Sequence, residues 1–199
     1  MELMKDLEFM VELEKMKKIF RRTWIIGEKR RENDAEHSWH IAVMGMLLGK
    51  YVREKDGQVA DMDKVVKMLL IHDIVEIYAG DTFAYDQVGS VGKREREIEA
   101  MELIKEKLSP ENAKMIGDLW TEFDEMTSGE AIFANAVDRL QPVLSNIYAD
   151  DGGTWSEFGV TRSQIMKRIE PIESFSAEIY AYVLEKIEEN IRKGFIKDE

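Results

Sequence analysis

The segment Leu69-Leu70-Ile71-His72-Asp73-Ile74-Val75-Glu76 places a histidine and two carboxylates at the end of an apolar run. Glu76 lies four residues after His72, so in a helix the two side chains share one face, with Asp73 alongside. Burying such a set among apolar residues costs free energy unless the groups pair or hold a cation. The segment therefore predicts a buried helix with a polar site, for which the rest of the chain should supply partners.

The composition favours helix along the whole chain. Its 199 residues are 44% hydrophobic and 34% charged, with three prolines, and Ala, Leu, Met, Glu and Lys fill the long periodic segments. That length suffices for one large domain with its own core, so we expect an all-α bundle with a single domain over residues 1–199. Thr127-Ser128-Gly129-Glu130 matches a capping box. The expected helices cover about residues 3–20, 35–54, 63–79, 93–108, 110–126, 130–148 and 173–193.

Charge and cysteine usage limit the partners and the compartment. A net charge of -12 offers no basic surface for a nucleic-acid polymer. The absence of cysteine excludes disulfides and thiol catalysis and fits a reducing compartment. The first residues do not look like a signal peptide, and the apolar stretch 39–49 is too short to span a bilayer. We therefore expect a cytoplasmic protein without a membrane partner.

Two further segments carry groups that could complete the polar site. His37 and His40 lie in an expected helix that is apolar nearly all round and therefore central. Either both bind one ion, or one binds it and the other supports it, or they are hydrogen-bonded core residues. Asp138 lies in an apolar part of helix 130–148 and precedes Arg139. It is either half of a buried ion pair or another carboxylate of the same site.

Asp81 and Arg22 stand at the borders of expected helices. Asp81 projects from the end of the helix that carries His72, and the loop at 83–92 has the length of a functional lid. Arg22 lies beside apolar and aromatic residues. Its guanidinium is either solvated or held as a rigid fork for a phosphate group.

The chemistry of the chain must come from histidine and carboxylate side chains. The sequence lacks a phosphate-binding loop, a nucleophile elbow and a dinucleotide-binding fingerprint. Two imidazoles with two carboxylates form a mixed nitrogen and oxygen set. Such a set suits Mn²⁺, Co²⁺, Ni²⁺, Fe²⁺ or Zn²⁺ better than Ca²⁺ or an all-oxygen Mg²⁺ site, with Mg²⁺ kept as an alternative.

Three strings carry a resemblance to a known family. They are Glu32-Asn33-Asp34-Ala35-Glu36-His37-Ser38, His72-Asp73-Ile74-Val75-Glu76 followed by Gly80-Asp81-Thr82, and Ala136-Val137-Asp138-Arg139-Leu140-Gln141-Pro142. Together and in this order, over about residues 15–160, they resemble the HD-domain superfamily of metal-dependent phosphohydrolases. They are most similar to the short single-domain group that includes the bacterial 5′-deoxynucleotidases and their archaeal and eukaryotic relatives. The resemblance implies an all-helical HD-type bundle.

The resemblance also implies a ligand set. One divalent metal ion would be held by His37, His72, Asp73 and Asp138. His40 has no ligand counterpart in the family, which makes it an outer support of the site or a core residue.

The family pattern gives three more residues a role. Glu76 and Asp81 correspond to catalytic acids, and Arg22, fifteen residues before His37, corresponds to the group that grips the phosphate. In the bacterial deoxynucleotidases a tryptophan directly follows that arginine, whereas Thr23 intervenes here before Trp24. This difference bears on how the sugar is recognised, and so on the preference for deoxyribose.

The implied activity is hydrolysis of (deoxy)nucleoside 5′-monophosphates to nucleoside and phosphate. The alternatives are an HD hydrolase of another phosphate ester (a nucleoside triphosphate, an alarmone or a cyclic nucleotide) or a non-catalytic HD scaffold that binds a nucleotide. Dimeric family members imply a homodimer, and we expect aromatic residues such as Trp120 and Phe123 to be exposed at its interface.

Overall fold

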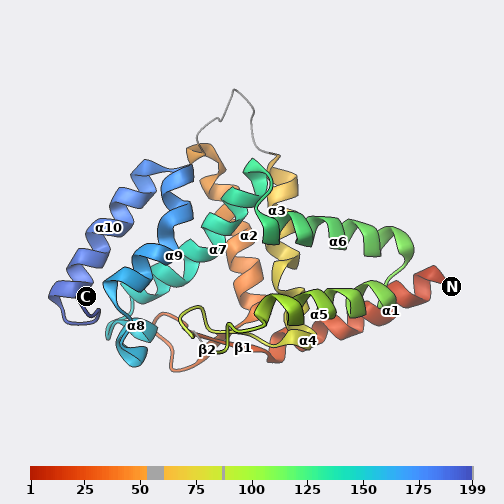
Figure 1. The fold of residues 1–199 in the computed structure, drawn as a ribbon, viewed down its shortest axis with the longest axis horizontal. Coiled ribbons are helices and arrows are strands. Elements are labelled where there is room, and N and C mark those ends of the chain that lie inside the picture. The colour runs from red at the N-terminus through yellow and green to blue at the C-terminus, as the bar shows by residue number, and fades with distance from the viewer. Residues whose placement is uncertain (53–60, 87, 199) are drawn as a thin grey trace.

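The computed structural model describes residues 1–52, 61–86 and 88–198, and these form a bundle of helices (Figure 1). The predicted all-α fold is confirmed, with one two-stranded hairpin as the only sheet of the described residues. The α-helices are α1 (Glu2–Glu12), α2 (Asp34–Leu48), α3 (Met62–Ile71), α4 (Glu76–Ala79), α5 (Lys93–Lys107), α6 (Pro110–Glu125), α7 (Gly129–Ile147), α8 (Gly153–Phe158), α9 (Arg162–Phe175) and α10 (Ala177–Arg192). Three 3₁₀ segments, η1 (Leu13–Lys18), η2 (Gly49–Tyr51) and η3 (His72–Val75), and two strands, β1 (Phe20–Trp24) and β2 (Arg31–Asn33), complete the description.

Helix α7 is the central element of the bundle. It contacts α2, α3, α6, α9 and α10, and most of its side chains are buried. Phe133 and Leu140 of α7 pack in one core with Ile41 of α2 and Leu69 of α3. Because α2, α3 and α7 meet here, any polar groups on their facing sides are forced together out of water.

The helix starts show which caps the sequence uses. Asn33 caps α2 and forms a capping box with Glu36, as the Ser/Thr/Asn/Asp preference for this position predicts. The predicted box at residues 127–130 is wrong. Ser128, not Thr127, caps α7, and the Glu130 carboxylate instead accepts the backbone N–H of Asp61.

The region before α2 differs from the predicted long helix. Helix α1 ends at Glu12, η1 continues to Lys18, and β1 then pairs antiparallel with β2. In β1 the side chain of Thr23 is buried and that of Arg21 is half-buried, whereas Arg22 is exposed. The hairpin thus directs two consecutive arginines differently, as alternating strand side chains require.

The helix predicted for residues 63–79 is present but changes its winding at the polar site. It runs as α3 to Ile71, tightens into η3 at His72 and resumes as α4. Gly80 follows with φ +75°, a conformation that glycine adopts without strain, and the helix ends at Ala79, as the predicted range 63–79 requires. The helix predicted to reach residue 54 ends at Leu48 and continues as η2, and its last predicted residues, 53–54, lie outside the described ones.

The C-terminal part contains two helices, α8 and α9, that periodicity did not predict. Helix α9 ends at Phe175, and Ser176 then caps α10, so the last helix begins at Ala177 rather than at residue 173. Trp120 and Phe123 are buried, which contradicts the expectation that they are exposed at an interface.

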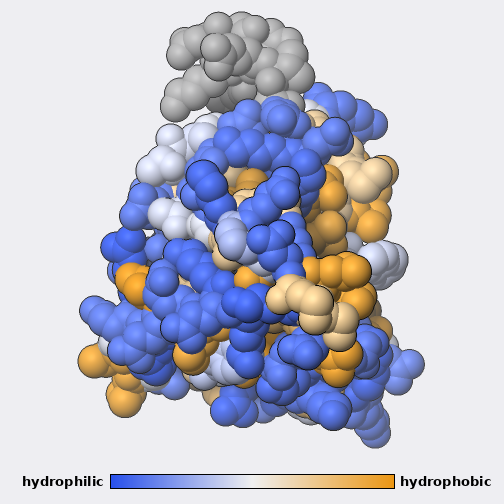
Figure 2. Space-filling model, turned by 90° about the vertical axis from the view of Figure 1, so that its right-hand side faces the viewer, coloured by the Kyte–Doolittle hydropathy of each residue, from blue (hydrophilic) through white to orange (hydrophobic). Residues whose placement is uncertain are grey.

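The surface agrees with the acidic composition. Seen from the end that carries the N-terminus, it is mostly hydrophilic, with small apolar patches between (Figure 2). None of the described helices is both long and apolar enough to span a bilayer.

Candidate active site

Four of the predicted ligands converge where α2, η3 and α7 meet. The His37 Nε2 atom lies 3.0 Å from Asp138 Oδ1 and 3.9 Å from Asp73 Oδ2. His72 Nε2 lies 3.0 Å from Asp73 Oδ1 and 3.6 Å from Asp138 Oδ1. All four residues are buried. Side chains 101 residues apart in the sequence thus face one point.

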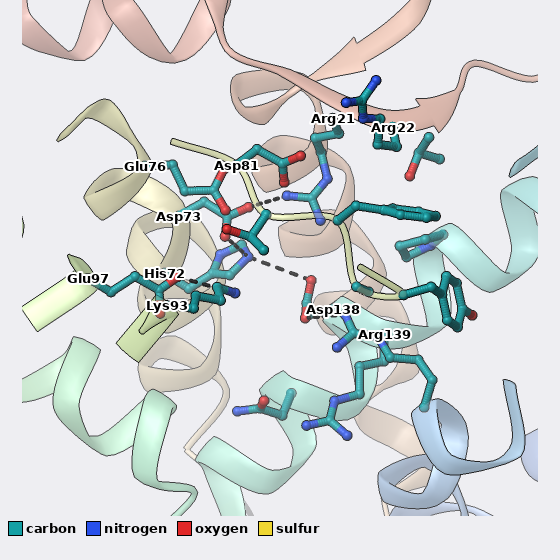
Figure 3. Close-up of a pocket in the computed structure, with 18 of the residues that line it drawn as sticks. Arg21, Arg22, His72, Asp73, Glu76, Asp81, Lys93, Glu97, Asp138 and Arg139 are labelled. Carbon is teal, nitrogen blue, oxygen red and sulfur yellow. Dashed lines mark hydrogen bonds and ion pairs between the residues drawn. The ribbon is translucent and has the colours of Figure 1, made fainter. Parts of the chain in front are cut away.

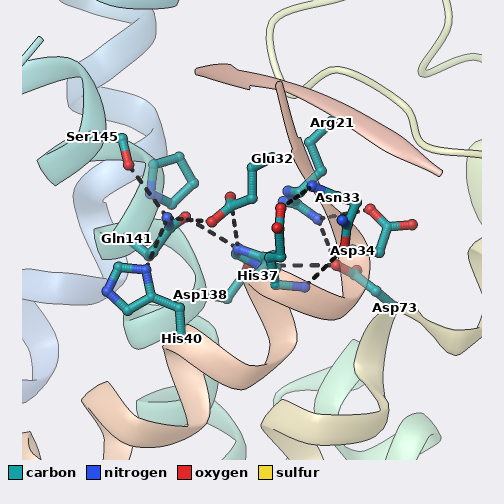
Figure 4. A network of polar contacts seen from close by, with 12 residues as sticks. Arg21, Glu32, Asn33, Asp34, His37, His40, Asp73, Asp138, Gln141 and Ser145 are labelled. Atoms are coloured by element: carbon teal, nitrogen blue, oxygen red, sulfur yellow. Dashed lines mark hydrogen bonds and ion pairs between the residues drawn. The ribbon is translucent and has the colours of Figure 1, made fainter. Parts of the chain in front are cut away.

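A hydrogen-bond chain fixes the orientation of His37 (Figure 4). Gln141 donates through Nε2 to the Glu32 carboxylate at 3.0 Å, which turns its Oε1 toward His37 Nδ1 at 3.1 Å. Nδ1 therefore carries the proton, and the lone pair of Nε2 points at Asp138. Asp138 and Gln141 are three residues apart on one face of α7, so both reach the same imidazole.

His72 is oriented in a comparable way by its own helix. Its Nδ1 lies 3.0 Å from the carbonyl oxygen of Leu69 and donates to it, which leaves Nε2 directed at Asp73 and Asp138. Nε2 is buried without a hydrogen-bond partner. Burial disfavours the imidazolium, but the two carboxylates outweigh it and raise the pKa of His72 to about 10. The site thus requires a positive charge between these groups.

A metal ion meets that requirement better than a proton on a single imidazole. Donor atoms of His37, His72 and Asp138 lie within 4.8 Å of one another, and Asp73 borders the same point. Two imidazole nitrogens and two carboxylates, with the outer nitrogens bonded to neighbours, form a donor set suited to a divalent transition metal. The residues present therefore fit the ion that the sequence predicts.

A second cluster, which we call the carboxylate cluster, adjoins the first and consists of Asp34, Asp73 and Glu76. Oxygen atoms of the three also lie within 4.8 Å of one another, and all three side chains are buried. Arg21 supplies positive charge here, since its Nη1 lies 2.5 Å from Asp73 Oδ2 and 3.9 Å from Asp34 Oδ1. Figure 3 shows Arg21 among Asp73, Glu76 and Asp81.

Burial changes the acidity of the carboxyl groups around Arg21. Burial, and then the charge of Asp73, raises the pKa of Glu76 well above its usual value, while Arg21 opposes the shift. Burial also raises the pKa of Asp81, again against Arg21. For Asp34, burial followed by Asp73 raises the pKa to about 7. Asp34 can therefore carry a proton near neutral pH.

Comparisons with known proteins agree with this geometry. The sequence pattern of the HD domain family matches residues 13–180. The chain belongs to the HD domain family. It is 33% identical, over 69% of its length and 74% of the relative, to 5′-deoxynucleotidase HDDC2 of Dictyostelium discoideum. With HDDC2 of Xenopus laevis the identity is 27% over 94% of this chain and 91% of the relative.

One solved structure matches nearly the whole HD domain chain. It is the crystal structure of a predicted metal-dependent phosphohydrolase from Magnetospirillum magnetotacticum, with a TM-score of 0.90, 42% identity, and coverage of 98% of this chain and 96% of that one. Family membership and the histidine and aspartate site together support a divalent metal ion in this chain.

The HD site opens into a cavity of about 250 Å³. Both predicted acids, Glu76 and Asp81, line it, as do Arg21 and Arg22. Arg22 also borders a neighbouring cavity of about 520 Å³, so it lies where the two cavities meet. The predicted site residues are therefore all at or beside one pocket.

Sequence reasoning missed several charged residues of this HD pocket. Arg21 was not singled out, although it lies closer to the ligand set than Arg22. The signal that identifies Arg21 is strand β1, because side chains alternate along a strand and one arginine points inward while the next points outward. Arg139 and Arg168 also line the cavity. Burial, and then Arg168, lowers the pKa of Arg139.

His40 lies outside the ligand set. It is exposed, and its Nδ1 is 3.4 Å from Gln141 Nε2. It therefore touches the support of His37 rather than the site itself, which matches the expected outer role and not the core alternative.

Proposed function

We propose that this HD domain protein is a metal-dependent 5′-deoxynucleotidase, which hydrolyses (deoxy)nucleoside 5′-monophosphates to nucleoside and phosphate. The observation that carries the proposal is the convergence of the Nε2 atoms of His37 and His72 on the carboxylates of Asp73 and Asp138. The names of the relatives in Dictyostelium discoideum and Xenopus laevis support the same reaction.

One divalent ion would be held by His37, His72, Asp73 and Asp138. The nitrogen and oxygen donors favour Mn²⁺, Co²⁺, Ni²⁺, Fe²⁺ or Zn²⁺, with Mg²⁺ as the alternative. When bound, the ion supplies Lewis-acid stabilisation of the phosphate charge and a more acidic water. Gln141 and the Leu69 carbonyl hold the two imidazoles in the tautomer that such an ion needs.

The phosphate group would be gripped by Arg22. Its guanidinium is exposed at the cavity mouth and can form two parallel hydrogen bonds to phosphate oxygens. Arg21 has a different task in this proposal, because it is bonded to Asp73. It holds that ligand in position and offsets the charge of the carboxylate cluster.

Glu76 and Asp81 would handle protons. A water oxygen forms a bond to phosphorus as the bond from phosphorus to O5′ breaks, so one proton leaves the water and one reaches O5′. The two carboxyl groups line the cavity beside the ligand set and can serve as base and acid for these transfers. Either assignment of the two tasks satisfies the geometry.

A panel of nucleotides with controlled metal content tests the proposal. Chelator-treated protein should release phosphate from deoxynucleoside 5′-monophosphates only after Mn²⁺ or Co²⁺ is added. Failure to cleave any monophosphate with every metal tried would refute it. A homodimer and a cytoplasmic location stay predictions of the same proposal, and light scattering of the purified protein tests the first.

A further inference from the structure

The cavity carries a second cationic group that the proposed reaction does not use. Arg139 of α7 and Arg168 of α9 both line it. In Figure 3, Arg139 lies on the opposite side of Asp138 from Arg21 and Arg22. A protein with a net charge of -12 thus places arginines on both sides of one small pocket.

Arg139 lacks a charge partner among the described residues. Its Nε is buried without a hydrogen-bond partner. Asp138 and Glu170 are the carboxylates that attract its charge, but in the described part of the chain neither forms an ion pair with it. A half-buried guanidinium in this state is costly in the free protein and gains most from an anion that enters the pocket.

Arg168 is only partly neutralised. Its Nη2 lies 3.5 Å from Asp138 Oδ2, and its side chain is 28% exposed. Asp138 Oδ1 also faces the Nε2 atoms of His37 and His72, so this carboxylate is shared between Arg168 and the ligand set. Arg168 therefore keeps donors available toward the cavity, next to the like charge of Arg139.

We propose that Arg139 and Arg168 bind a second phosphate group of the substrate. This inference rests on the proposed function, which leaves the 5′-phosphate to the ligand set and Arg22. The preferred substrate class would then be a nucleotide with two phosphate groups, either on both the 3′ and 5′ oxygens or joined as a diphosphate. Two guanidiniums on adjacent helices match the oxygens of one phosphate, and each charge-assisted bond adds affinity.

Paired substrates test the proposal directly. The experiment compares kcat/KM for deoxyadenosine 5′-monophosphate with that for its 3′,5′-bisphosphate and 5′-diphosphate, using the metal-loaded chain. We expect a two-phosphate substrate to be preferred. Arg139→Gln and Arg168→Gln should each lower the ratio of the two kcat/KM values about tenfold, the loss expected for a charged hydrogen bond. The ratio compares substrates on one protein, so altered metal content cancels.

Matched variants separate binding from folding. Arg139→Lys should recover part of the ratio, because it keeps the charge without the fork. Arg162→Gln on α9 removes an arginine that bonds Glu188 at the surface and should leave the ratio unchanged. An unchanged ratio in Arg139→Gln, or no preference of the wild type for either two-phosphate substrate, overturns the inference.

Failure of the proposed function is distinguishable from failure of this inference. If no nucleotide is cleaved, the proposed function fails, and calorimetry of the same nucleotides decides the inference without turnover. Tighter binding of a two-phosphate nucleotide that is lost in Arg139→Gln supports the second phosphate site. Equal affinities in both proteins contradict it.

Discussion

The pocket contains two buried clusters, which adjoin at Asp73 and balance their negative charge in different ways. In the cluster of His37, His72 and Asp138, both imidazoles turn Nε2 toward carboxylates, and Arg168 reaches only Asp138 Oδ2, at 3.5 Å, so the point between the two nitrogens is left for an ion. In the carboxylate cluster, Arg21 supplies the positive charge from within the chain. The difference teaches that acidic residues alone do not mark a metal site, because a neighbouring guanidinium can take the place of an ion.

The largest expected effect comes from removing a donor of the cluster of His37, His72 and Asp138. His72→Ala removes a donor at the point where α2, η3 and α7 meet, so the ion and its Lewis-acid effect are lost. We expect phosphate release to fall about ten thousandfold, to background. Steady-state assays and metal analysis check this, with His40→Ala as the control histidine. Normal turnover of His72→Ala would remove His72 from the site.

A smaller loss of activity is expected from a change in the carboxylate cluster that leaves the pair of Arg21 and Asp73 intact. Glu76→Gln keeps the shape of the side chain but cannot accept a proton, so kcat should fall about a thousandfold. Metal content should stay at the wild-type level, in contrast to His72→Ala. If Glu76→Gln loses the metal as well, Glu76 is a ligand and the two clusters are one site.

The role of Arg21 in the carboxylate cluster can be tested through the free energy of unfolding. Arg21→Gln leaves three buried carboxylates without the guanidinium that pairs with Asp73. We expect the metal-free protein to lose about 3 kcal/mol of unfolding free energy, as when one partner of a buried ion pair is removed. Urea unfolding at neutral pH measures this, with Arg30→Gln, an exposed arginine paired with Glu36, as the control. Equal losses in both variants would contradict the role of Arg21.

The smallest expected effect concerns the support of His37. Gln141→Leu removes the acceptor of the Nδ1 proton, so the imidazole loses its fixed tautomer. Metal affinity should weaken about tenfold, the usual cost of an outer-shell change, with the fold retained. Competition with a chelator of known affinity provides the measurement. An unaltered affinity would mean that Asp138 alone orients His37.

The sequence predicted those parts of the pocket that lie on long helices. Periodicity places His37, His72 and Asp138 on helices, whereas their assignment to one metal site comes from the resemblance to the HD-domain family. Arg21 could not be chosen over Arg22, because the register of a strand decides it and the segment was expected to connect two helices.

Charged residues brought in by tertiary packing were missed for a related reason. Arg168 lies on α9, a helix of weak apolar pattern that contains Pro171, and nothing local places it beside Asp138. Asp34 belongs to the first of the three sequence strings, but the sequence assigns it no role in the site. Its burial beside Asp73 and Glu76 depends on how the hairpin and η3 pack, which no local rule supplies.

The number of metal ions bound per chain tests most directly whether the cluster of His37, His72 and Asp138 holds the ion and the carboxylate cluster does not. Wild type, His72→Ala and Glu76→Gln would be dialysed against Mn²⁺ or Co²⁺, freed of excess ion and analysed for metal per chain. The account predicts one ion in the wild type, none in His72→Ala and one in Glu76→Gln. Two ions in the wild type, or one ion that survives His72→Ala and disappears in Glu76→Gln, would contradict it.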